Sequence, residues 1–540
     1  MTTEPARGRI AELLRAAEPA PRLLGGLVER LAKAAILRGA RSGGRPIGAA
    51  ALADIRIATL AFDSRRVAPG TLFVAISGEH ADGHDFAGAA AERGAVAVIV
   101  ERPLPEVALP QLVVERTPAA LAQAATWWYG DPSHQLAVVG ITGTDGKSTT
   151  CALAVAVLEA AGLSSGLVGT VETKIDGVRE ANPEHVTTPQ APELQAALRA
   201  MADAGDRVAV VETTSHGLAL ERVAGIAYDV AVFTNLSHEH LELHGTFERY
   251  RAAKLGLFES LARRSPTKTG TPRAGIVNRD DANAGLFEAV VRESGARLLT
   301  YGTDPGADVR AEKIEEDAHR LRVHVVTARW SGPVDLLLAG RFNAHNALAA
   351  WAVGEAFGLD PDAIRRGLES VAGVAGRMER VDVGQPFGVI VDYAHSPAAL
   401  EKVLDVLAPL AAAQGGGLIA VFGSAGERDV AKRPLMGRVA GERARLVVLA
   451  DEDPRGEDPM AILDEIARGA EAAGRRRGRD LLLVPDRRAA IQAAFERAKP
   501  GDIVLLAGKG HEVSIIVGTE PRPWNERRAA EDLLAEMGYR

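Results

Sequence analysis

One ten-residue stretch, Gly140-Ile141-Thr142-Gly143-Thr144-Asp145-Gly146-Lys147-Ser148-Thr149, limits what this chain can fold into more than any other. The apolar run at residues 136–141 leads into it and predicts a buried parallel strand. The apolar segment at residues 151–158, which Gly162 closes, predicts a helix. A glycine-rich turn therefore joins a strand to a helix, an arrangement typical of α/β proteins.

The chemistry of this turn points to phosphate binding. Glycines let the backbone approach a ligand closely, and the unpaired N–H groups at the start of a helix attract an anion. Lys147 would place a positive charge beside the β- and γ-phosphates, and the Ser148 hydroxyl would bind Mg²⁺. We therefore expect a nucleotide-binding loop formed by Gly143, Thr144, Asp145, Gly146, Lys147, Ser148 and Thr149.

The spacing differs from that of the common P-loop, because the residue five positions before Gly146 is Ile141 and not glycine. The form found here, Thr-Gly-Thr-x-Gly-Lys-Ser-Thr, is rarer by chance and therefore more informative. The alternative is a tight strand-to-helix turn that carries a surface lysine. Two glycines, a lysine and a hydroxyl in register favour the phosphate loop.

Composition narrows the class of protein. With 540 residues, the chain is long enough for about three or four domains. Its net charge of -8 gives no support to a nucleic-acid-binding role. Cys151 is the only cysteine, and its place in an apolar helix predicts a buried structural thiol. No apolar run approaches the ~20 residues of a membrane span, and a single cysteine suits a reducing compartment, so we expect a cytoplasmic protein without membrane insertion. We also expect a monomer.

The apolar pattern divides the chain into four parts. Residues 1–45 are predicted to form a helical extension that ends in a flexible linker at 38–45, and residues 46–134 a mixed α/β domain. Residues 135–339 are predicted to form a central domain and residues 340–540 a third domain. In the second part, strands are expected at 58–61, 72–76 and 95–100.

Strands alternate with helices in both later domains, which predicts parallel sheets. In the central domain the strands are expected at 208–211, 230–233 and 275–277, and the period-two pattern at 321–326 predicts an added antiparallel hairpin. In the third domain they are expected at 389–392, 418–422, 446–449, 481–484 and 503–506. Polar loops follow four of these, at 392–395, 423–429, 451–455 and 508–512, and four such loops in series suggest one shared cleft.

Candidate metal ligands follow two strands of the central domain. Glu212 ends one strand, and His240 lies in the polar loop that follows the next. Because parallel strands end at the same sheet edge, both side chains should lie near Lys147, where phosphates and a carboxylate suit Mg²⁺. A transition-metal site built from three histidines and a set of solvated loop histidines are the competing interpretations. Lys254, early in an amphipathic helix, is by its chemistry alone a surface lysine.

Taken together, the motifs resemble those of the Mur ligases, and most closely the MurE type, over roughly residues 55–530. The segments that carry this resemblance are 142–149, 212–218, 234–245, Arg341-Phe342-Asn343-Ala344-His345-Asn346-Ala347, Gly376-Arg377-Met378-Glu379-Arg380-Val381, Asp392-Tyr393-Ala394-His395-Ser396-Pro397 and, near the N-terminus, 62–65, 73–76 and 82–84. The resemblance implies an α/β protein of three domains: a UDP-sugar-binding N-terminal domain, a central P-loop ATPase domain with a parallel sheet, and a Rossmann-like C-terminal domain.

The resemblance also implies a reaction. ATP would phosphorylate the D-Glu carboxylate of UDP-N-acetylmuramoyl-L-Ala-D-Glu, and the amine of a diamino acid would then attack the acyl phosphate to form an amide. A carboxylate is a poor electrophile, and phosphorylation gives it a leaving group. The implied cofactors are ATP and two Mg²⁺ ions, and the implied partners are the UDP-muramoyl dipeptide and a diamino acid, in peptidoglycan synthesis.

Site residues follow from the same resemblance, position by position. The catalytic residues would be Lys147, Glu212, His240 and Lys254, and metal would be held by Ser148, Glu212, His240 and Lys254, the last as an N-carbamate. ATP contacts beyond the loop would come from Asn346, Arg377, Asp392 and His395. The UDP-sugar dipeptide would contact Ser64, Thr187, Thr188, Thr214 and Arg222. The acceptor amino acid would contact Arg428, Asp453, Arg455, Gly508 and Glu512.

Three departures from the family pattern bear on this interpretation. Asp145 stands where asparagine is usual and adds a negative charge near the phosphates. His238-Glu239-His240 replaces Arg-Asp-His. Glu452-Asp453-Pro454-Arg455 stands where Asp-Asn-Pro-Arg is typical of enzymes that use diaminopimelate, so Asp453 adds a negative charge in place of asparagine. Because Arg455 is retained, and guanidinium binds carboxylate bidentately, we expect meso-diaminopimelate as the acceptor, with L-lysine or L-ornithine as the alternatives.

Two further hypotheses remain at this point. One is another ligase of the same superfamily, such as a folylpolyglutamate synthase, against which the N-terminal motifs and the Asp-Pro-Arg pocket argue. The other is an inactive ATP-binding scaffold, which loss of Lys147, Glu212 or His240 would have favoured, yet all three are present.

Overall fold

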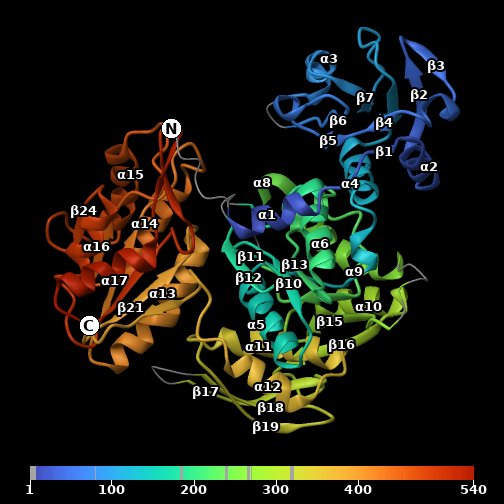
Figure 1. The fold of residues 1–540 in the computed structure, drawn as a ribbon. Helices are drawn as coiled ribbons and strands as arrows, with labels where there is room; N and C mark the ends of the chain where they lie inside the picture. The colour runs from blue at the N-terminus through green and yellow to red at the C-terminus, as the bar shows by residue number, and fades with distance from the viewer. Residues whose placement is uncertain are drawn as a thin grey trace.

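The structure, a computed structural model, describes residues 8–78, 81–182, 186–237, 241–263, 268, 270–316 and 321–539. The chain forms three bodies that follow one another in sequence, coloured blue, teal to yellow, and orange to red in Figure 1. Each body has a sheet at its centre with helices packed against it, so the predicted α/β class is confirmed.

The first body contains a six-stranded sheet in the order β3-β2-β8-β7-β6-β5. Its strands are β2 (Leu37–Ser42), β3 (Arg45–Ile47), β5 (Thr59–Ala61), β6 (Thr71–Val74), β7 (Ala95–Val100) and β8 (Gln111–Val114). Helices α2 (Gly25–Lys33) and α4 (Thr117–Trp128) pack on one face of this sheet, and α3 (Ala87–Glu92) packs on the other. The three strands expected in this part of the chain are therefore present.

The flexible linker expected at residues 38–45 is wrong. That segment forms the antiparallel hairpin β2–β3, with Ala40 opposite Ile47, and β2 also pairs with β8. β3 is the edge strand and β2 lies next to it, and both are only partly covered, so they lack the apolar run of a central strand. The first sheet consequently begins before residue 46.

Helix α1 (Arg9–Ala16) lies on the central body rather than on the first sheet (Figure 1). Ile10 is buried in the central core, and its N–H donates to the carboxylate of Glu180 over 3.0 Å. Farther along, the Glu18 carboxylate accepts from the Trp128 indole over 3.4 Å and from the Tyr129 hydroxyl over 3.0 Å. The segment before α2 thus ties the first two bodies together.

The central body contains an eleven-stranded sheet in the order β12-β11-β10-β13-β9-β14-β15-β16-β17-β18-β19. Its strands are β9 (Ala137–Thr142), β10 (Ser165–Val168), β11 (Glu172–Ile175), β12 (Val178–Ala181), β13 (Val208–Glu212), β14 (Val230–Phe233), β15 (Ala274–Asn278), β16 (Arg297–Gly302), β17 (Val309–Glu316), β18 (Leu321–Val326) and β19 (Ser331–Leu336). Seven neighbouring strands of this sheet run parallel, as expected: β10, β13, β9, β14, β15, β16 and β17. The period-two segment becomes β18, which pairs antiparallel with β17 and β19.

Strand β9 is buried on both faces, which explains its unbroken apolar sequence. Val139 and Ile141 face the core formed with α5 (Lys147–Ala160), α11 (Phe342–Ala356) and α12 (Pro361–Glu369). Val138 faces the opposite core, formed with α6 (Ala191–Ala204), α9 (Phe247–Glu259) and α10 (Ala284–Ser294). The phosphate loop therefore leaves the most enclosed part of the sheet.

The domain boundary predicted at residue 340 lies too early. Trp351 and neighbouring side chains of α11 are buried in the core of the central sheet, together with Ile364 of α12. Helix α11 is rich in alanine and buried on nearly every side, so its pattern does not reveal which sheet it covers. The third body begins after α12.

The third body contains a six-stranded sheet in the order β20-β21-β25-β22-β23-β24, parallel except for the edge strand β20. Its strands are β20 (Glu379–Val381), β21 (Gly388–Asp392), β22 (Leu418–Phe422), β23 (Leu446–Leu449), β24 (Leu481–Leu483) and β25 (Ile503–Ala507). One face is covered by α13 (Pro397–Ala413), α14 (Lys432–Arg443) and α15 (Pro459–Ala472), and the other by α16 (Arg487–Phe495) and α17 (Glu526–Glu536). The hairpin β26 (Ser514–Val517) and β27 (Glu520–Pro523) follows β25. The expected doubly wound sheet is confirmed.

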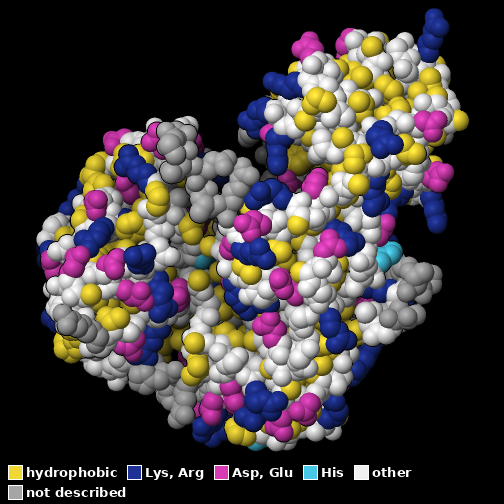
Figure 2. Space-filling view, viewed as in Figure 1, with side chains coloured by type: hydrophobic (Ala, Val, Ile, Leu, Met, Phe, Trp, Pro, Cys, Tyr) yellow, Lys and Arg dark blue, Asp and Glu magenta, His cyan; other side chains and the backbone are white. Residues whose placement is uncertain are grey.

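The surface carries both signs of charge. On the face drawn in Figure 2, Lys and Arg side chains are interspersed with Asp and Glu side chains over all three bodies. Within the described ranges, no helix has the length and apolar character that a membrane crossing needs.

Candidate active site

The phosphate loop is the turn between β9 and α5, and two glycines fix its shape. Gly143 has a φ of +155°, and a Cβ there would lie 1.8 Å from the hydroxyl oxygen of Thr234. Gly146 has a φ of +81°, and a Cβ there would lie 2.3 Å from Oδ1 of Asn346. Both the backbone angles and the close neighbours therefore require glycine. The loop leads directly into the N-terminus of α5, whose first N–H groups have no helical acceptor.

Neighbouring strand ends hold the loop in place. The N–H of Thr144 donates to the Asn235 carbonyl over 2.8 Å, and that of Asp145 donates to Oδ1 of Asn235 over 2.9 Å. Nζ of Lys147 donates to the carbonyl oxygens of Gly143 and Thr144 over 3.1 and 2.7 Å, so its ammonium lies over the turn. The loop residue Thr149 is buried in the first turn of α5.

Glu212 lies at the end of β13, immediately beside the loop, as the strand order predicts. Its Oε1 accepts from the Ser148 hydroxyl over 3.0 Å, and its Oε2 accepts from the N–H of Thr170 over 2.9 Å. Both Glu212 and Ser148 are buried. A hydroxyl and a carboxylate are thus brought together at the start of α5, and hard oxygen donors of this kind suit Mg²⁺.

The interpretation of Lys254 as a surface lysine is wrong. Its side chain is only 1% exposed, and Nζ donates to the Gly143 carbonyl over 2.6 Å. Nζ also lies 4.5 Å from the ring centroid of Tyr250, whose hydroxyl is 3.0 Å from the Thr144 hydroxyl. Helix α9 therefore places a buried lysine directly behind the phosphate loop.

His240, the other candidate metal ligand, lies outside the described residues, as do His238 and Glu239. Among the residues that are described, no group of three or more His, Cys, Asp or Glu side chains is arranged to hold a metal ion. Cys151 is buried in α5, and burial raises the pKa of its thiol well above the usual value, as expected for a structural thiol.

A second cluster lies at the end of β13, where the dipeptide contacts are expected. The Thr188 hydroxyl donates to the Glu212 carbonyl over 2.9 Å and lies 3.0 Å from the Thr214 hydroxyl. The guanidinium of Arg222 donates to the Thr188 carbonyl over 3.0 Å, and the Thr170 hydroxyl donates to Thr187 over 2.9 Å. Thr187, Thr188, Thr214 and Arg222 are therefore brought together beside Glu212.

The first body reaches toward this cluster through the turn that contains Ser64. Arg66, two residues on, lies 3.7 Å from the carboxylate of Glu193 at the start of α6. Ser64 itself belongs to the short helix Ser64–Arg66, which Asp63 caps through the N–H of Arg65. The pKa of Asp63 is lowered by its hydrogen bonds to Arg65.

The third body contributes its expected nucleotide residues from the opposite side. The guanidinium of Arg377 donates to the Ser148 hydroxyl over 3.3 Å and lies 5.1 Å from the ring centroid of Tyr393. Asn346 belongs to α11 of the central body, where its Oδ1 accepts from the Thr150 hydroxyl over 3.3 Å. The phosphate loop is therefore contacted from both bodies.

Burial keeps the Asp392 and His395 side chains from carrying charge readily. The Asp392 carboxylate accepts from the N–H groups of Met378 and Ala394, each over 2.8 Å, and burial raises its pKa despite the nearby Arg377. Burial lowers the pKa of His395, as does the charge of Lys432. His395 Nδ1 lies 2.9 Å from the Tyr393 carbonyl and donates to it, so its Nε2 is the nitrogen left for a ligand.

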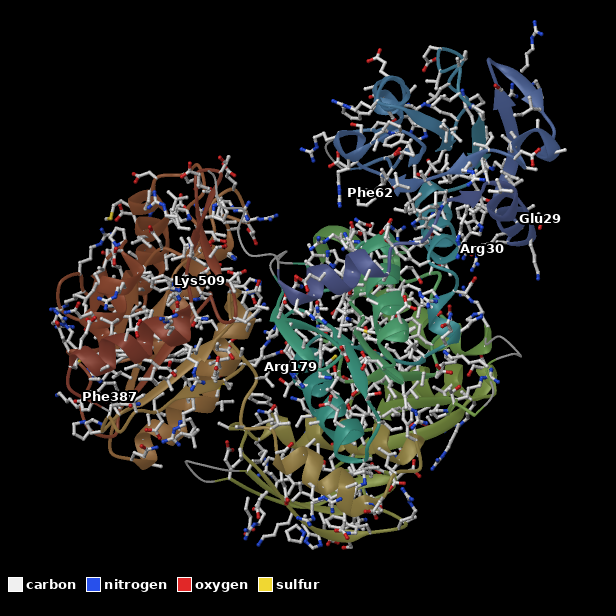
Figure 3. The ribbon with its side chains drawn as sticks, viewed as in Figure 1. Glu29, Arg30, Phe62, Arg179, Phe387 and Lys509 are labelled. Atoms are coloured by element: carbon white, nitrogen blue, oxygen red, sulfur yellow. The ribbon has the colours of Figure 1, made fainter. Side chains whose placement is uncertain are left out.

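The acceptor residues form a buried cluster around Lys509, which Figure 3 labels within the third body. Nζ of Lys509 lies 2.8 Å from Oδ1 of Asp453 and 2.5 Å from Oε2 of Glu512, and the lysine is fully buried. Glu512 in turn accepts from the Tyr393 hydroxyl over 3.2 Å, and Gly508 packs against the Glu452 carboxylate. Arg428 lies exposed after β22 and, among the described residues, forms no hydrogen bond or ion pair with this cluster.

Arg455 differs from the other charged side chains of this cluster. No carboxylate of the described residues forms an ion pair with it, and its Nε is buried without a hydrogen-bond partner among them. Its φ is +52°, a left-handed conformation that is unusual for arginine. The N–H and carbonyl of Arg455 are held by Ile516 and Gly518, at 3.0 and 2.8 Å. The backbone thus fixes a cation whose charge remains available.

A cavity of about 610 Å³ opens beside Ser148 and Glu212. It is lined by α5, by the β10–β12 edge that includes Arg179, and by residues 370–375, which connect to the third body. Figure 3 shows Arg179 on the side of the central body that faces the third. The cavity therefore connects the phosphate loop with the space between the two bodies.

Sequence reasoning missed Lys509, Glu452 and Lys402. Lys509 and Glu452 lie in polar loops that were recognised, but their burial and pairing depend on strands far apart in sequence. Lys402 lies on α13, and its Nζ is 2.5 Å from Oδ2 of Asp145, 257 positions away. A lysine on an amphipathic helix gives no sequence signal for such a contact.

Models of three Mur ligase domains match successive parts of the chain. The family model described as the Mur ligase family, catalytic domain, matches residues 56–129. The family model of the Mur ligase middle domain matches residues 141–354, and the family model of the Mur ligase glutamate ligase domain matches residues 376–510. UDP-N-acetylmuramyl-tripeptide synthetase of a Roseiflexus species is 50% identical over 491 residues, which is 89% of this chain and 95% of the relative.

Two further comparisons agree. The UDP-N-acetylmuramoyl-L-alanyl-D-glutamate--2,6-diaminopimelate ligase of Bacillus velezensis is 40% identical, covering 90% of this chain and 95% of the relative. A solved structure of a ligase with the same name matches with a TM-score of 0.60 and 30% identity, covering 89% of this chain and 95% of that one. With its family models matched in order and relatives this similar over nearly their full length, the chain belongs to the Mur ligase family.

Proposed function

We propose that this protein is an ATP-dependent ligase that joins meso-diaminopimelate to UDP-N-acetylmuramoyl-L-Ala-D-Glu in peptidoglycan synthesis. One observation carries the proposal. The phosphate loop, the carboxylate of Glu212 and the guanidinium of Arg377 from the third body meet at the Ser148 hydroxyl. Phosphoryl transfer to a carboxylate needs such a convergence, because charge must be balanced on the moving group from several sides.

The residues present fit magnesium and ATP. Ser148 at the start of α5 and Glu212 at the end of β13 offer oxygen donors. The absence of a Cβ at Gly143 and Gly146 leaves space in the loop that a side chain would fill. In the proposal these two side chains hold one Mg²⁺, with His240, while a carbamate on Lys254 would supply oxygens for a second. When bound, the ions would neutralise charge on the phosphates. Asn346, Asp392 and His395 would contact the rest of the nucleotide.

The chain's own residues would then support two steps. Lys147 and Arg377 stabilise negative charge while the D-Glu carboxylate attacks the γ-phosphorus and ADP leaves, giving an acyl phosphate. The acceptor amine next attacks the acyl carbon, and phosphate departs as the amide forms. Thr187, Thr188, Thr214 and Arg222 would orient the dipeptide, and the turn with Ser64 would hold its UDP end. Correct orientation of both reactants supplies much of the rate.

Charge pairing in the acceptor pocket favours diaminopimelate over lysine or ornithine. Lys509 already balances Asp453, so the added carboxylate does not present a free anion to the acceptor's second ammonium. Arg455 is held by its backbone and has no acidic partner among the described residues, so it suits a distal carboxylate. Lysine and ornithine lack that carboxylate and would leave the cation unpaired. Glu512 and Gly508 complete this pocket in the proposal.

The diaminopimelate ligases among the relatives support the same choice. The name of the tripeptide synthetase leaves the amino acid open. We also propose that the protein works as a monomer in the cytoplasm, where ATP and UDP-linked precursors are made. The alternative of a folylpolyglutamate synthase finds no support in these relatives.

A phosphate-release assay with a panel of acceptors tests the proposal. Purified protein would receive Mg-ATP, the UDP-muramoyl dipeptide and either meso-diaminopimelate, L-lysine or L-ornithine, with folate plus glutamate as the rival pair. We expect phosphate release that depends on the dipeptide and is strongest with meso-diaminopimelate. Equal or faster turnover with lysine would overturn the choice of acceptor, and turnover with folate would overturn the substrate class.

A further inference from the structure

Asp145 is the residue of the phosphate loop whose charge the proposed chemistry does not explain. Its backbone is fixed, since its carbonyl accepts from the Thr234 hydroxyl over 2.7 Å and its N–H donates to Asn235 over 2.9 Å. Its side chain is 50% exposed and extends from the loop. A carboxylate here stands next to the position proposed for a highly charged nucleotide, and like charges repel.

Lys402 of the third body meets this carboxylate. Nζ of Lys402 lies 2.5 Å from Oδ2 of Asp145. Helix α13 begins at Pro397, two residues after His395, so its first turn follows directly on a residue proposed to contact ATP. The contact joins the phosphate loop to a helix of a different body.

The sequence of α13 directs Lys402 toward the central body. Leu400, Leu404 and Leu407 recur at helical spacing and are buried in the core of the third body. Glu401 and Asp405, on a flank of the helix, both pair with Arg443 of α14. Lys402 therefore lies off the buried face, and its partner comes from the phosphate loop.

Two contacts from the third body thus flank the loop. Lys402 pairs with Asp145 of the loop. Three residues after Asp145, the Ser148 hydroxyl accepts a hydrogen bond from the guanidinium of Arg377 over 3.3 Å. We propose that Lys402 is a positioning residue for the nucleotide: it offsets the charge of Asp145 and so keeps the third body docked over the phosphate loop. This inference rests on the proposed binding of ATP by that loop.

The size of the effect follows from the exposure of the pair. Both side chains are about half exposed, at 54% and 50%. An exposed pair of this kind shifts binding by roughly two- to fivefold and weakens as salt screens it. The consequence is a modest but salt-sensitive contribution to nucleotide affinity that depends on both partners.

Calorimetric titration with Mg-ADP tests the inference without needing turnover. The variants are Lys402→Ala, Lys402→Arg, Asp145→Asn and the double variant Asp145→Asn/Lys402→Ala. Lys313→Ala is the matched control, because Lys313 is an exposed lysine paired with Glu315 on the distant strand β17. We expect Lys402→Ala to raise the Kd about two- to fivefold at low salt, Lys402→Arg to restore most of the affinity, and Lys313→Ala to leave the Kd unchanged.

The double variant decides whether the two charges act together. With Asp145 replaced, loss of Lys402 should change the Kd clearly less than it does in the unaltered protein. An unchanged Kd in Lys402→Ala, or an equal loss in both backgrounds, would overturn the inference. Failure of the unaltered protein to bind Mg-ADP at all would instead contradict the proposed function, so the two failures can be told apart.

Discussion

The Ser148 hydroxyl donates to Oε1 of Glu212 over 3.0 Å, and this contact joins the first turn of α5 to the end of the neighbouring strand β13. The two side chains lie close together because β13 and β9 are adjacent and parallel, so both strands end at the same edge of the sheet. The arrangement places a carboxylate where the terminal phosphates and a cation are proposed to bind.

Replacement of Glu212 by glutamine should weaken metal binding with little change in side-chain shape. The amide oxygen can still accept from the N–H of Thr170, while the charge and the second accepting oxygen, which faces the Ser148 hydroxyl, are lost. We expect the Mg²⁺ concentration for half-maximal activity to rise about tenfold or more. Glu172→Gln is the control, because Glu172 lines the same cavity but pairs with Arg179. Equal Mg²⁺ dependence of the two variants would argue against Glu212 as a ligand.

Lys254→Ala should lower kcat by more than about 100-fold, because it removes a group directly behind the phosphate loop. A short carboxylic acid added to the assay should restore part of the activity if the natural group is a carbamate. Native mass analysis at neutral pH of the unaltered protein prepared with bicarbonate should show the added mass of one carbon dioxide, because acid would decarboxylate a carbamate. Full activity of Lys254→Ala, or rescue by a short amine and not by an acid, would contradict the carbamate.

Lys509→Met should alter acceptor selection. Loss of this buried cation removes the positive charge that balances Asp453, and the Asp453 carboxylate would then repel the distal carboxylate of diaminopimelate. We expect the KM for diaminopimelate to rise about 30-fold or more, since one partner of a buried charge pair is removed. Adding Asp453→Asn to this variant should recover part of the loss. If the double variant is no better than Lys509→Met, charge balance is not the role of this lysine.

Asp451 should make stability depend on pH. Burial raises its pKa to about 6, against a usual value of 3.8. Because the folded state holds this proton more tightly than the unfolded state, stability falls as pH rises from about 4 to 6 and then levels off. Asp451→Asn should therefore gain stability relative to the unaltered protein across that window and keep the gain at pH 7.5. Urea unfolding at pH 4.5, 6 and 7.5 checks this, and a gain that is equal at all three would contradict it.

Much of the fold is readable from local patterns, because buried parallel strands are short, apolar and bounded by polar turns. β14 was expected at residues 230–233 and is found there, and the glycine-rich turn leads from β9 into α5 as predicted. The sequence does not reveal the hairpin β2–β3, because both of its strands are only partly covered and carry no continuous apolar run. The sequence places helix α11 in the wrong body, because a helix buried on nearly every side has no apolar face that indicates which sheet it covers.

The sequence predicts only part of the site, because some of its contacts join residues that are far apart in the chain. Glu212 follows from the rule that parallel strands end at one edge, and that rule needs only adjacent strands. The pairing of Lys509 with Asp453 joins residues 56 positions apart, and that of Lys402 with Asp145 joins residues 257 apart. Such contacts depend on how loops and bodies meet in space. Neither helical period nor motif spacing specifies that meeting.

The most direct measurement follows oxygen from the D-Glu carboxylate during turnover. Protein would be given Mg-ATP, meso-diaminopimelate and UDP-N-acetylmuramoyl-L-Ala-D-Glu labelled with ¹⁸O in the carboxylate that is to react. If the carboxylate is activated by phosphoryl transfer, the released phosphate carries one labelled oxygen per amide formed. Phosphate released without label, alongside a labelled amide, would contradict an acyl phosphate and with it the proposed role of the cleft.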